Sequence, residues 1–146
     1  MHINLESDYA VRIVYCLARF GQKMDAQRIA EETGVSQRFT LKIMRKLVTA
    51  GLVTSFKGAH GGYMLSRAPE EITLRQAIEA VEGPYRFSRC LDKHYDCNNP
   101  DSLCCPFHHI FGDITHMVVQ RLDTITFDPK RMEQYAVAQK GNVKPE

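Results

Sequence analysis

The chain has little of what marks an exported, membrane-bound or catalytic protein. In residues 1–20 no basic run precedes a long apolar stretch, because Asp8, Arg12 and Arg19 interrupt the apolar residues. We therefore expect neither a signal peptide nor a membrane span there. No Ser/His/Asp, phosphate-loop or paired-carboxylate constellation stands out, and the sequence has no internal repeat or low-complexity segment. These absences predict a cytoplasmic protein that is not an enzyme and has no membrane partner.

Acidic residues are missing from one long segment. Between Ser36 and Arg67 there is no Asp or Glu, whereas six basic residues occur there: Arg38, Lys42, Arg45, Lys46, Lys57 and Arg67. The net charge of the whole chain is only +2, so the local excess is more informative than the total. A block this one-sided is expected where a surface approaches the phosphates of double-stranded DNA. The alternative is a basic, solvated helix face.

The first 49 residues follow the helix-turn-helix pattern. Apolar residues recur every three or four positions from Tyr9 to Phe20, which predicts an amphipathic helix. Asp25 is placed to cap a second helix that ends at Gly34, and Ser36 to cap a third. At ~100° per residue the third helix has an apolar arc: Phe39, Leu41, Ile43, Met44, Leu47 and Val48. Its opposite arc is polar, as a recognition helix requires: Arg38, Lys42, Arg45, Lys46 and Thr49.

A β-hairpin is predicted next, from two β-prone runs at 52–56 and 63–65 around a glycine-rich turn. A two-stranded wing after a recognition helix is the winged-helix plan. Lys57 and His60 lie at its tip, where the glycines let the backbone approach the sugar-phosphate chain. Thr73 is placed to cap a further helix that ends before Gly83. The predicted DNA-binding residues are Ser36, Gln37, Arg38, Lys42, Arg45, Lys46, Lys57, His60 and Tyr63.

The C-terminal part divides into a loop and a long helix. Residues 85–105 show little periodicity, and a loop of more than about 12 residues is usually functional or disordered. Pro106 opens a helix with a sustained apolar stripe: Phe107, Ile110, Phe111, Ile114, Met117, Val118, Leu122 and Ile125. One small domain does not easily cover such a stripe, so we infer a homodimer; plain intramolecular core is the alternative. The expected fold is mainly α with a small β-hairpin, a winged helix-turn-helix at 1–84, a cysteine loop at 85–105, a dimerisation helix at 106–128 and an extension at 129–146.

Four of the five cysteines cluster in that loop. Cys90, Cys97 and either Cys104 or Cys105 are separated by six, then six or seven residues, whereas Cys16 falls on an apolar helical face and is expected in the core. In a reducing compartment such a cluster indicates a metal or redox centre rather than a disulfide framework. Thiolates suit iron–sulfur centres. A zinc site that also uses His108 has unusually long gaps, and a thiol switch through the same cysteines is the other alternative.

Several motifs, in order, resemble the Rrf-two (Rrf2) family of bacterial transcription regulators, over about residues 1 to 128. They are Asp8-Tyr9-Ala10-Val11-Arg12, Gly51-Leu52-Val53, Lys57-Gly58, Gly61-Gly62-Tyr63, Pro69-Glu70-Glu71-Ile72-Thr73 and Ala80-Val81-Glu82-Gly83. The resemblance implies a homodimeric, sequence-specific DNA-binding regulator. A labile iron–sulfur cluster, 4Fe-4S or 2Fe-2S, in the loop before the dimerisation helix would sense nitric oxide, redox state or iron–sulfur supply.

The same resemblance implies a ligand set. Cys90, Cys97 and Cys105 correspond to the family's three cysteines, with Cys104 as the competing third ligand. The fourth ligand is either Asp8, reaching over from the partner subunit as in NsrR-like members, or His108, as in IscR-like members. The longer gaps and the adjacent Cys104 and Cys105 depart from the usual pattern. A cluster-free regulator and a winged-helix protein-docking module remain as alternative functions.

Overall fold

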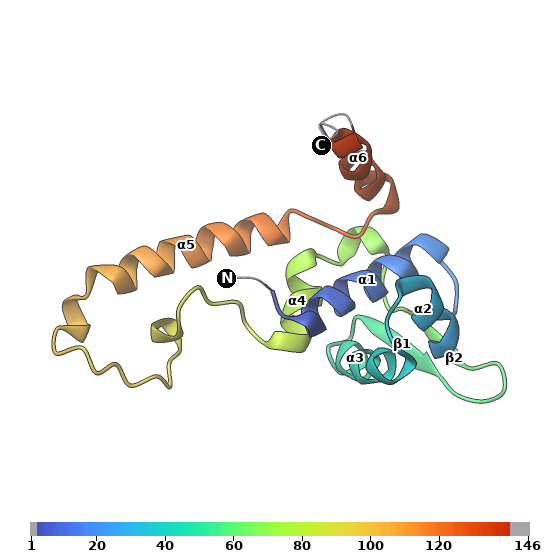
Figure 1. Cartoon of the computed structure of the whole chain (residues 1–146), viewed down its shortest axis with the longest axis horizontal. Coiled ribbons are helices and arrows are strands. Elements are labelled where there is room, and N and C mark those ends of the chain that lie inside the picture. The colour runs from blue at the N-terminus through green and yellow to red at the C-terminus, as the bar shows by residue number, and fades with distance from the viewer. Residues whose placement is uncertain (1–2, 141–146) are drawn as a thin grey trace, which may run out of the picture.

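The computed structural model describes residues 3–140 and has the predicted mainly α fold with one β-hairpin (Figure 1). Residues 141–146, the end of the predicted extension at 129–146, lie outside the described residues. Three short 3-10 turns lie at Pro69–Glu71, Arg89–Leu91 and Ser102–Cys104. The regular elements are α1 (Leu5–Phe20), α2 (Ala26–Thr33), α3 (Gln37–Thr49), β1 (Val53–Phe56), β2 (Gly62–Leu65), α4 (Leu74–Glu82), α5 (Pro106–Asp123) and α6 (Pro129–Lys140).

Polar caps define where α2 and α3 begin. The side chain of Asp25 accepts a hydrogen bond from the Arg28 backbone N–H at 2.8 Å, and the Ser36 hydroxyl accepts one from Phe39 N–H at 3.3 Å. Each bond satisfies a backbone donor that has no partner within the first helical turn. Gly34 ends α2 in the left-handed conformation, with φ of 69°, as expected of a C-terminal glycine. Both predicted caps of the helix-turn-helix are confirmed.

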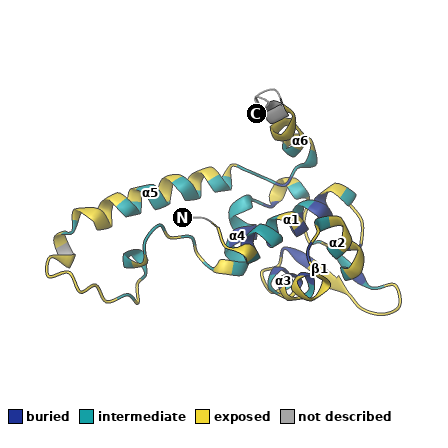
Figure 2. Ribbon diagram, viewed as in Figure 1, coloured by how far each residue is buried: buried dark blue, intermediate teal, exposed yellow. Residues whose placement is uncertain are grey.

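Helices α1 to α4 and strand β1 enclose one hydrophobic core. Figure 2 shows the buried residues gathered in these elements and not along α5. Cys16 is buried in this core as predicted, at 6% exposure. Its burial raises the pKa of the thiol, which keeps the sulfur protonated and unreactive. The largest fully buried side chains are Ser7, Ile13, Val14, Leu17, Met24, Ile29, Thr40, Ile43, Met44, Leu47, Val53 and Ile72.

The hairpin is anchored to the helical body through Met24. Strands β1 and β2 pair antiparallel with Val53 opposite Leu65 and Phe56 opposite Gly62. Met24 and Tyr63 exchange two backbone hydrogen bonds, of 2.9 and 2.7 Å, so the segment before α2 forms a short antiparallel β-bridge with β2. A Cβ at Gly62 would lie 2.7 Å from the Met24 carbonyl oxygen. Glycine at this position therefore allows the wing to lie against the body.

Helix α5 extends away from the helical core, and the chain returns to it only at the end of that helix (Figure 1). There the Leu74 N–H donates to the Ile125 carbonyl at 2.8 Å, and Phe127 is buried at 3% exposure. Phe107, Ile110 and Met117 of α5 are 60%, 48% and 68% exposed. Within residues 3–140, no helix is long and apolar enough to cross a membrane.

Candidate nucleic-acid interface and cysteine loop

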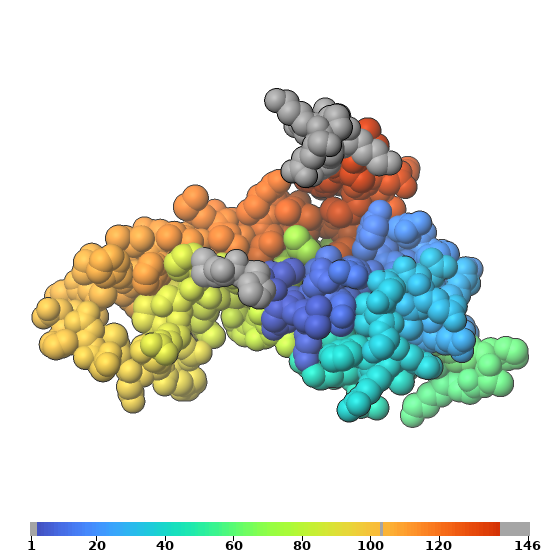
Figure 3. Space-filling model, viewed as in Figure 1, coloured from blue at the N-terminus to red at the C-terminus, as the bar shows by residue number. Residues whose placement is uncertain are grey.

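Helix α3 and its N-cap present an exposed polar surface. Ser36, Gln37, Arg38 and Arg45 are exposed, together with Lys42. These side chains, with Phe39 and Leu41, line an open hollow of about 820 Å³. Figure 3 shows α3 in cyan on the surface and the turn of the hairpin, in green, projecting beside it. Exposed donors on a helix next to a projecting loop form a surface that can follow a groove and its flanking backbone.

The buried arc of α3 is narrower than the apolar arc predicted from the sequence. Thr40 is fully buried together with Ile43, Met44 and Leu47, whereas Phe39 is 39% exposed. Phe39, which belongs to the predicted apolar arc, therefore lies outside its buried part. Buried residues at i, i+3, i+4 and i+7 put the centre of the arc between Thr40 and Leu47, so Phe39 lies at its margin. Its ring meets the Tyr9 ring edge to face, with centroids 5.8 Å apart.

Two of the predicted DNA-binding lysines are held by a carboxylate of α1. The Lys42 ammonium donates to one oxygen of Glu6, and the Lys46 ammonium donates to the other oxygen at 2.5 Å. Lys46 also donates to the Val81 carbonyl of α4 at 3.1 Å. Hydrogen bonds from Lys42 and Lys46 lower the pKa of Glu6. Among the ion pairs of residues 3–140, neither Arg38 nor Arg45 takes part in one.

The wing carries a cation that the sequence analysis missed. Lys57 and His60 are exposed in the turn of the hairpin, while Tyr63 is half-buried beside Met24. Lys23 lies over the exposed ring of Phe56, with its ammonium 5.4 Å from the ring centroid. Such a contact holds the lysine beside the hairpin. Lys23 lies outside the acid-free segment, so the charge pattern did not predict its place beside the wing. The sequence signal for it would have been Phe56, an aromatic residue in the wing that can hold a cation.

The start of the cysteine loop is anchored on α5. The Phe87 N–H donates to the Thr115 hydroxyl at 3.0 Å, and the Phe87 and Phe111 rings lie 5.3 Å apart. Leu91 packs near Gly112, where an added Cβ would lie 3.9 Å from its Cδ2. These contacts hold the 3-10 turn that contains Cys90 against the middle of α5, about 10 Å along the helix axis from Cys105, given 1.5 Å per residue.

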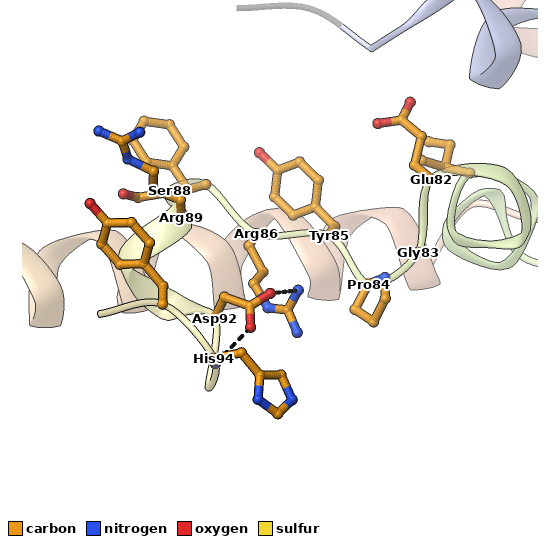
Figure 4. Close-up of a pocket in the computed structure, with 12 residues that line it drawn as sticks. Glu82, Gly83, Pro84, Tyr85, Arg86, Ser88, Arg89, Asp92 and His94 are labelled. Carbon is orange, nitrogen blue, oxygen red and sulfur yellow. Dashed lines mark hydrogen bonds and ion pairs between the residues drawn. The ribbon is translucent and has the colours of Figure 1, made fainter. Parts of the chain in front are cut away.

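A pocket of about 710 Å³ lies along this anchored segment (Figure 4). Inside it Arg86 forms an ion pair with Asp92 at 3.0 Å, and the Arg89 guanidinium lies 5.3 Å from the Tyr95 ring centroid. The backbone N–H of His94, and secondarily Arg86, lower the pKa of Asp92. Local polar contacts therefore shape the path of the chain from 86 to 95.

The structure does not bring the predicted cluster cysteines together. Cys97 and Cys104 are exposed, Cys90 and Cys105 are half-buried, and all four thiols are free. In the part of the chain that the structure describes, no three His, Cys, Asp or Glu side chains lie close enough to share a metal ion. The donors nevertheless fit an iron–sulfur centre in kind, because they are accessible soft thiols in one short segment. Ligation of one centre by these thiols requires the segment 92–104 to rearrange.

The two candidate fourth ligands lie on different helices. Asp8, in the first turns of α1, pairs with Arg12 at 2.7 Å, and 40% of its side chain is exposed. His108 is exposed in the first turn of α5, with its ring centroid 6.0 Å from that of His109. Both side chains are accessible to an incoming ligand.

A recognition-type helix with a projecting hairpin defines the class of winged-helix DNA-binding proteins. Comparison with known proteins narrows this class to one family. A family model named Rrf2, described as an iron-dependent transcriptional regulator, matches residues 3–129. The chain thus belongs to the Rrf2 family: it is a DNA-binding transcriptional regulator and not an enzyme.

Individual relatives agree with the family. Protein aau3 of Rhizobium meliloti (strain 1021) is 36% identical over 105 residues, which cover 70% of this chain and 68% of aau3. The HTH-type transcriptional regulator IscR of Pectobacterium carotovorum subsp. carotovorum (strain PC1) is 28% identical over 130 residues, 88% of this chain and 77% of IscR. The structure of CymR (YrzC), the global cysteine regulator of B. subtilis, matches with a TM-score of 0.67 at 25% identity, covering 88% of this chain and 94% of CymR.

Proposed function

We propose that this chain is a homodimeric, sequence-specific transcription regulator whose DNA binding responds to a labile iron–sulfur cluster in the loop 85–105. The observation that carries the proposal is the set of four free thiols between Cys90 and Cys105. This set stands directly before α5 and lies within the region that matches an iron-dependent regulator family. The signal would be nitric oxide, redox state or iron–sulfur supply.

For DNA binding, the exposed surface of α3 and the wing supply complementary contacts. Arg38 and Arg45 are exposed and outside the ion pairs of residues 3–140, so their guanidinium groups can donate to base edges in the major groove. Ser36 and Gln37 lie at the exposed start of the same helix. Lys57 and His60 would follow the backbone or the minor groove from the hairpin turn, and Tyr63 follows them in β2.

For the cluster, the ligands would be Cys90, Cys97 and Cys105, with Cys104 as the competing third thiol. A bound cluster supplies a redox-active and nitric-oxide-reactive group. Cys90 and Cys105 are already held against α5, so the loop between them is the part that moves. Asp8 of a partner subunit or His108 would complete the set. Releasing Asp8 from Arg12 costs little, because an exposed ion pair contributes about 0–1 kcal/mol.

For the dimer, the exposed apolar side chains of α5 are the support. Phe107, Ile110 and Met117 expose about half or more of their surface in one chain. Burying the part that is still exposed against a second copy is favourable by about 1 kcal/mol each. Changing Ile114 or Val118 to a charged residue is expected to give monomer or aggregate by sedimentation. A monodisperse monomer of the unmodified protein at micromolar concentration would contradict the dimer.

The test of the cluster begins with protein isolated without oxygen. We expect visible absorption that changes on addition of nitric oxide, together with iron and acid-labile sulfide. The double change Cys90→Ala with Cys97→Ala should remove all three signals and alter the affinity for the operator. If this change leaves iron content and operator affinity unaltered, the sensing function is wrong.

A thiol switch is the second candidate function, and one observation favours it: Cys104 and Cys105 are adjacent, free and at least partly accessible. Oxidation of accessible thiols would then change the loop without any metal. Anaerobic protein would contain neither iron nor sulfide, and mild oxidant would change its DNA affinity. Zinc in place of iron would identify a structural Cys3His site instead. A salt titration on duplex DNA tests the docking-module alternative, since a protein-docking module has no salt-dependent DNA affinity.

A further inference from the structure

Glu6 lies at the junction of three helices. It belongs to the first turn of α1, and its two carboxylate oxygens each accept from a lysine of α3. Lys42 and Lys46 are four residues apart and hence on the same face of the helix. Lys46 reaches further, to the Val81 carbonyl in the last turn of α4, where the helix dipole favours a cation. One carboxylate therefore joins α1 to the recognition helix and, through Lys46, to α4.

We propose that Glu6 is a positioning residue for DNA binding: it holds Lys42 and Lys46 away from DNA phosphates and leaves Arg38 and Arg45 as the cations of α3 that contact DNA. The inference rests on the proposed DNA surface of α3 and the wing. The inference divides the basic residues of α3 into two sets: Lys42 and Lys46, which pair with Glu6, and Arg38 and Arg45, which have no such partner among the described ion pairs. The acidic partner comes from outside the acid-free segment, 36 positions before Lys42.

Pairing, and not burial, keeps Lys42 from phosphate. Its side chain is 53% exposed, whereas that of Glu6 is 24% exposed and also pairs with Lys46. This contact is therefore less exposed than the Asp8–Arg12 pair, whose side chains are 40% and 50% exposed. A lysine whose charge is balanced by a neighbouring carboxylate neutralises no phosphate, so it displaces no counterion from DNA. Arg45, one turn away from Lys42 on the outer face, has no such partner among the described ion pairs. The two cations are thus equivalent in the sequence pattern and different in the structure.

The pairing also sets the orientation of α3. Two lysines on one carboxylate resist rotation of the helix about its axis, because rotation would separate one ammonium from its oxygen. The same contacts hold the recognition helix against α1 and α4. With Glu6 neutralised, the lysines would be free to bind phosphates of any sequence, so non-specific affinity would rise relative to specific affinity.

The salt dependence of binding to a duplex of arbitrary sequence tests this inference without knowledge of the operator. Each phosphate contact contributes about 0.9 to the slope of log affinity against log salt. We expect Lys57→Met in the full-length protein to make the slope about 0.9 shallower, and Lys42→Met, which keeps the aliphatic stem, to leave it near the wild-type value. Glu6→Gln should steepen the slope by the amount expected of one to two phosphate contacts. The double variant with Glu6→Gln and Lys42→Met should have a slope between those of Glu6→Gln and the wild type.

Each outcome decides the matter. If Lys42→Met lowers the slope as much as Lys57→Met, or if Glu6→Gln leaves the slope unchanged or shallower, the inference is wrong. A merely structural role of Glu6 would weaken binding without steepening the slope. If Glu6→Gln does not fold, as judged by circular dichroism, the comparison of Lys42→Met with Lys57→Met decides alone. Wild-type protein whose binding does not depend on salt would instead contradict the proposed DNA surface itself.

Discussion

The Ser7 hydroxyl donates a hydrogen bond to the Glu82 carboxylate, although 75 positions separate the two residues. The same carboxylate oxygen accepts from the Asn4 backbone N–H at 3.2 Å. Glu82 is the last residue of α4, and the chain continues from it through Gly83 into the cysteine loop. Since Glu6 joins this first turn of α1 to α3, the start of the cysteine loop and the recognition helix are tied to the same turn.

Removing this hydrogen bond should cost stability. Ser7 is fully buried, and a hydrogen bond to a charged group contributes about 1.5–3 kcal/mol. We expect Ser7→Ala to lower the free energy of unfolding in urea by about that amount. Ser55→Ala, at an exposed position of β1, is the matched control and should change stability little. A Ser7→Ala variant as stable as the control would show that the bond contributes nothing.

Removing the Thr40 hydroxyl should have the opposite effect and raise stability. Its buried hydroxyl has no hydrogen-bond partner among the described residues, and an unsatisfied buried polar group costs about 1–3 kcal/mol. Thr40→Val replaces the hydroxyl by a methyl group of similar shape and should raise the melting temperature. Thr33→Val is the control, because the Thr33 hydroxyl donates to the Ile29 carbonyl at 2.7 Å. It should destabilise, and loss of stability in both variants would contradict the prediction.

Acid should weaken the contact between α1 and α3. Hydrogen bonds from Lys42 and Lys46 lower the pKa of Glu6 below its ordinary value of 4.5. A carboxylate with a lowered pKa in the folded state stabilises the protein above its unfolded pKa, and this contribution is lost as pH falls through the folded pKa. The stability difference between wild type and Glu6→Gln should thus be largest above pH 4.5 and shrink in more acidic solution. A difference that is constant from neutral to acidic pH would rule out this linkage.

The local parts of the fold could be predicted from the sequence because each depends on residues close together in the chain. Asp25 and Ser36 each accept a hydrogen bond from the backbone N–H three residues ahead, and Gly34 ends α2 by its own conformation. The partners of Lys42 could not be predicted, because Glu6 comes into range only when α1 packs on α3. Phe39 is exposed for a related reason: periodicity defines an apolar arc, and tertiary packing decides how much of that arc is buried.

The cysteine loop shows a different limit. The sequence pattern indicates which thiols could bind one centre, but spacing alone does not say how a loop without regular periodicity folds. In the structure, aromatic and backbone contacts to α5 hold the turn around Cys90, and Cys97 is left in the exposed part of the loop. The chemistry of the site could therefore be predicted, and its geometry could not.

The last prediction separates the roles of the individual cysteines. Cys90→Ala or Cys97→Ala should abolish the cluster, because two thiolates do not hold it. Cys104→Ala should spare the cluster and Cys105→Ala should not, as judged by iron content and visible absorption of anaerobic protein. Asp8→Ala should leave a cluster that is lost faster on exposure to oxygen, since three thiolates remain while one weak ligand has gone.

The same variants test how the cluster acts on DNA. Its assembly would shift the spacing of the two recognition helices, which must match half-sites about 34 Å apart. A tenfold change in operator affinity requires only about 1.4 kcal/mol of differential binding between the two states. We expect Cys97→Ala to bind the operator with one fixed affinity, while wild type changes affinity when the cluster is destroyed. If Cys104→Ala loses iron and Cys105→Ala retains it, the third ligand is Cys104 and not Cys105.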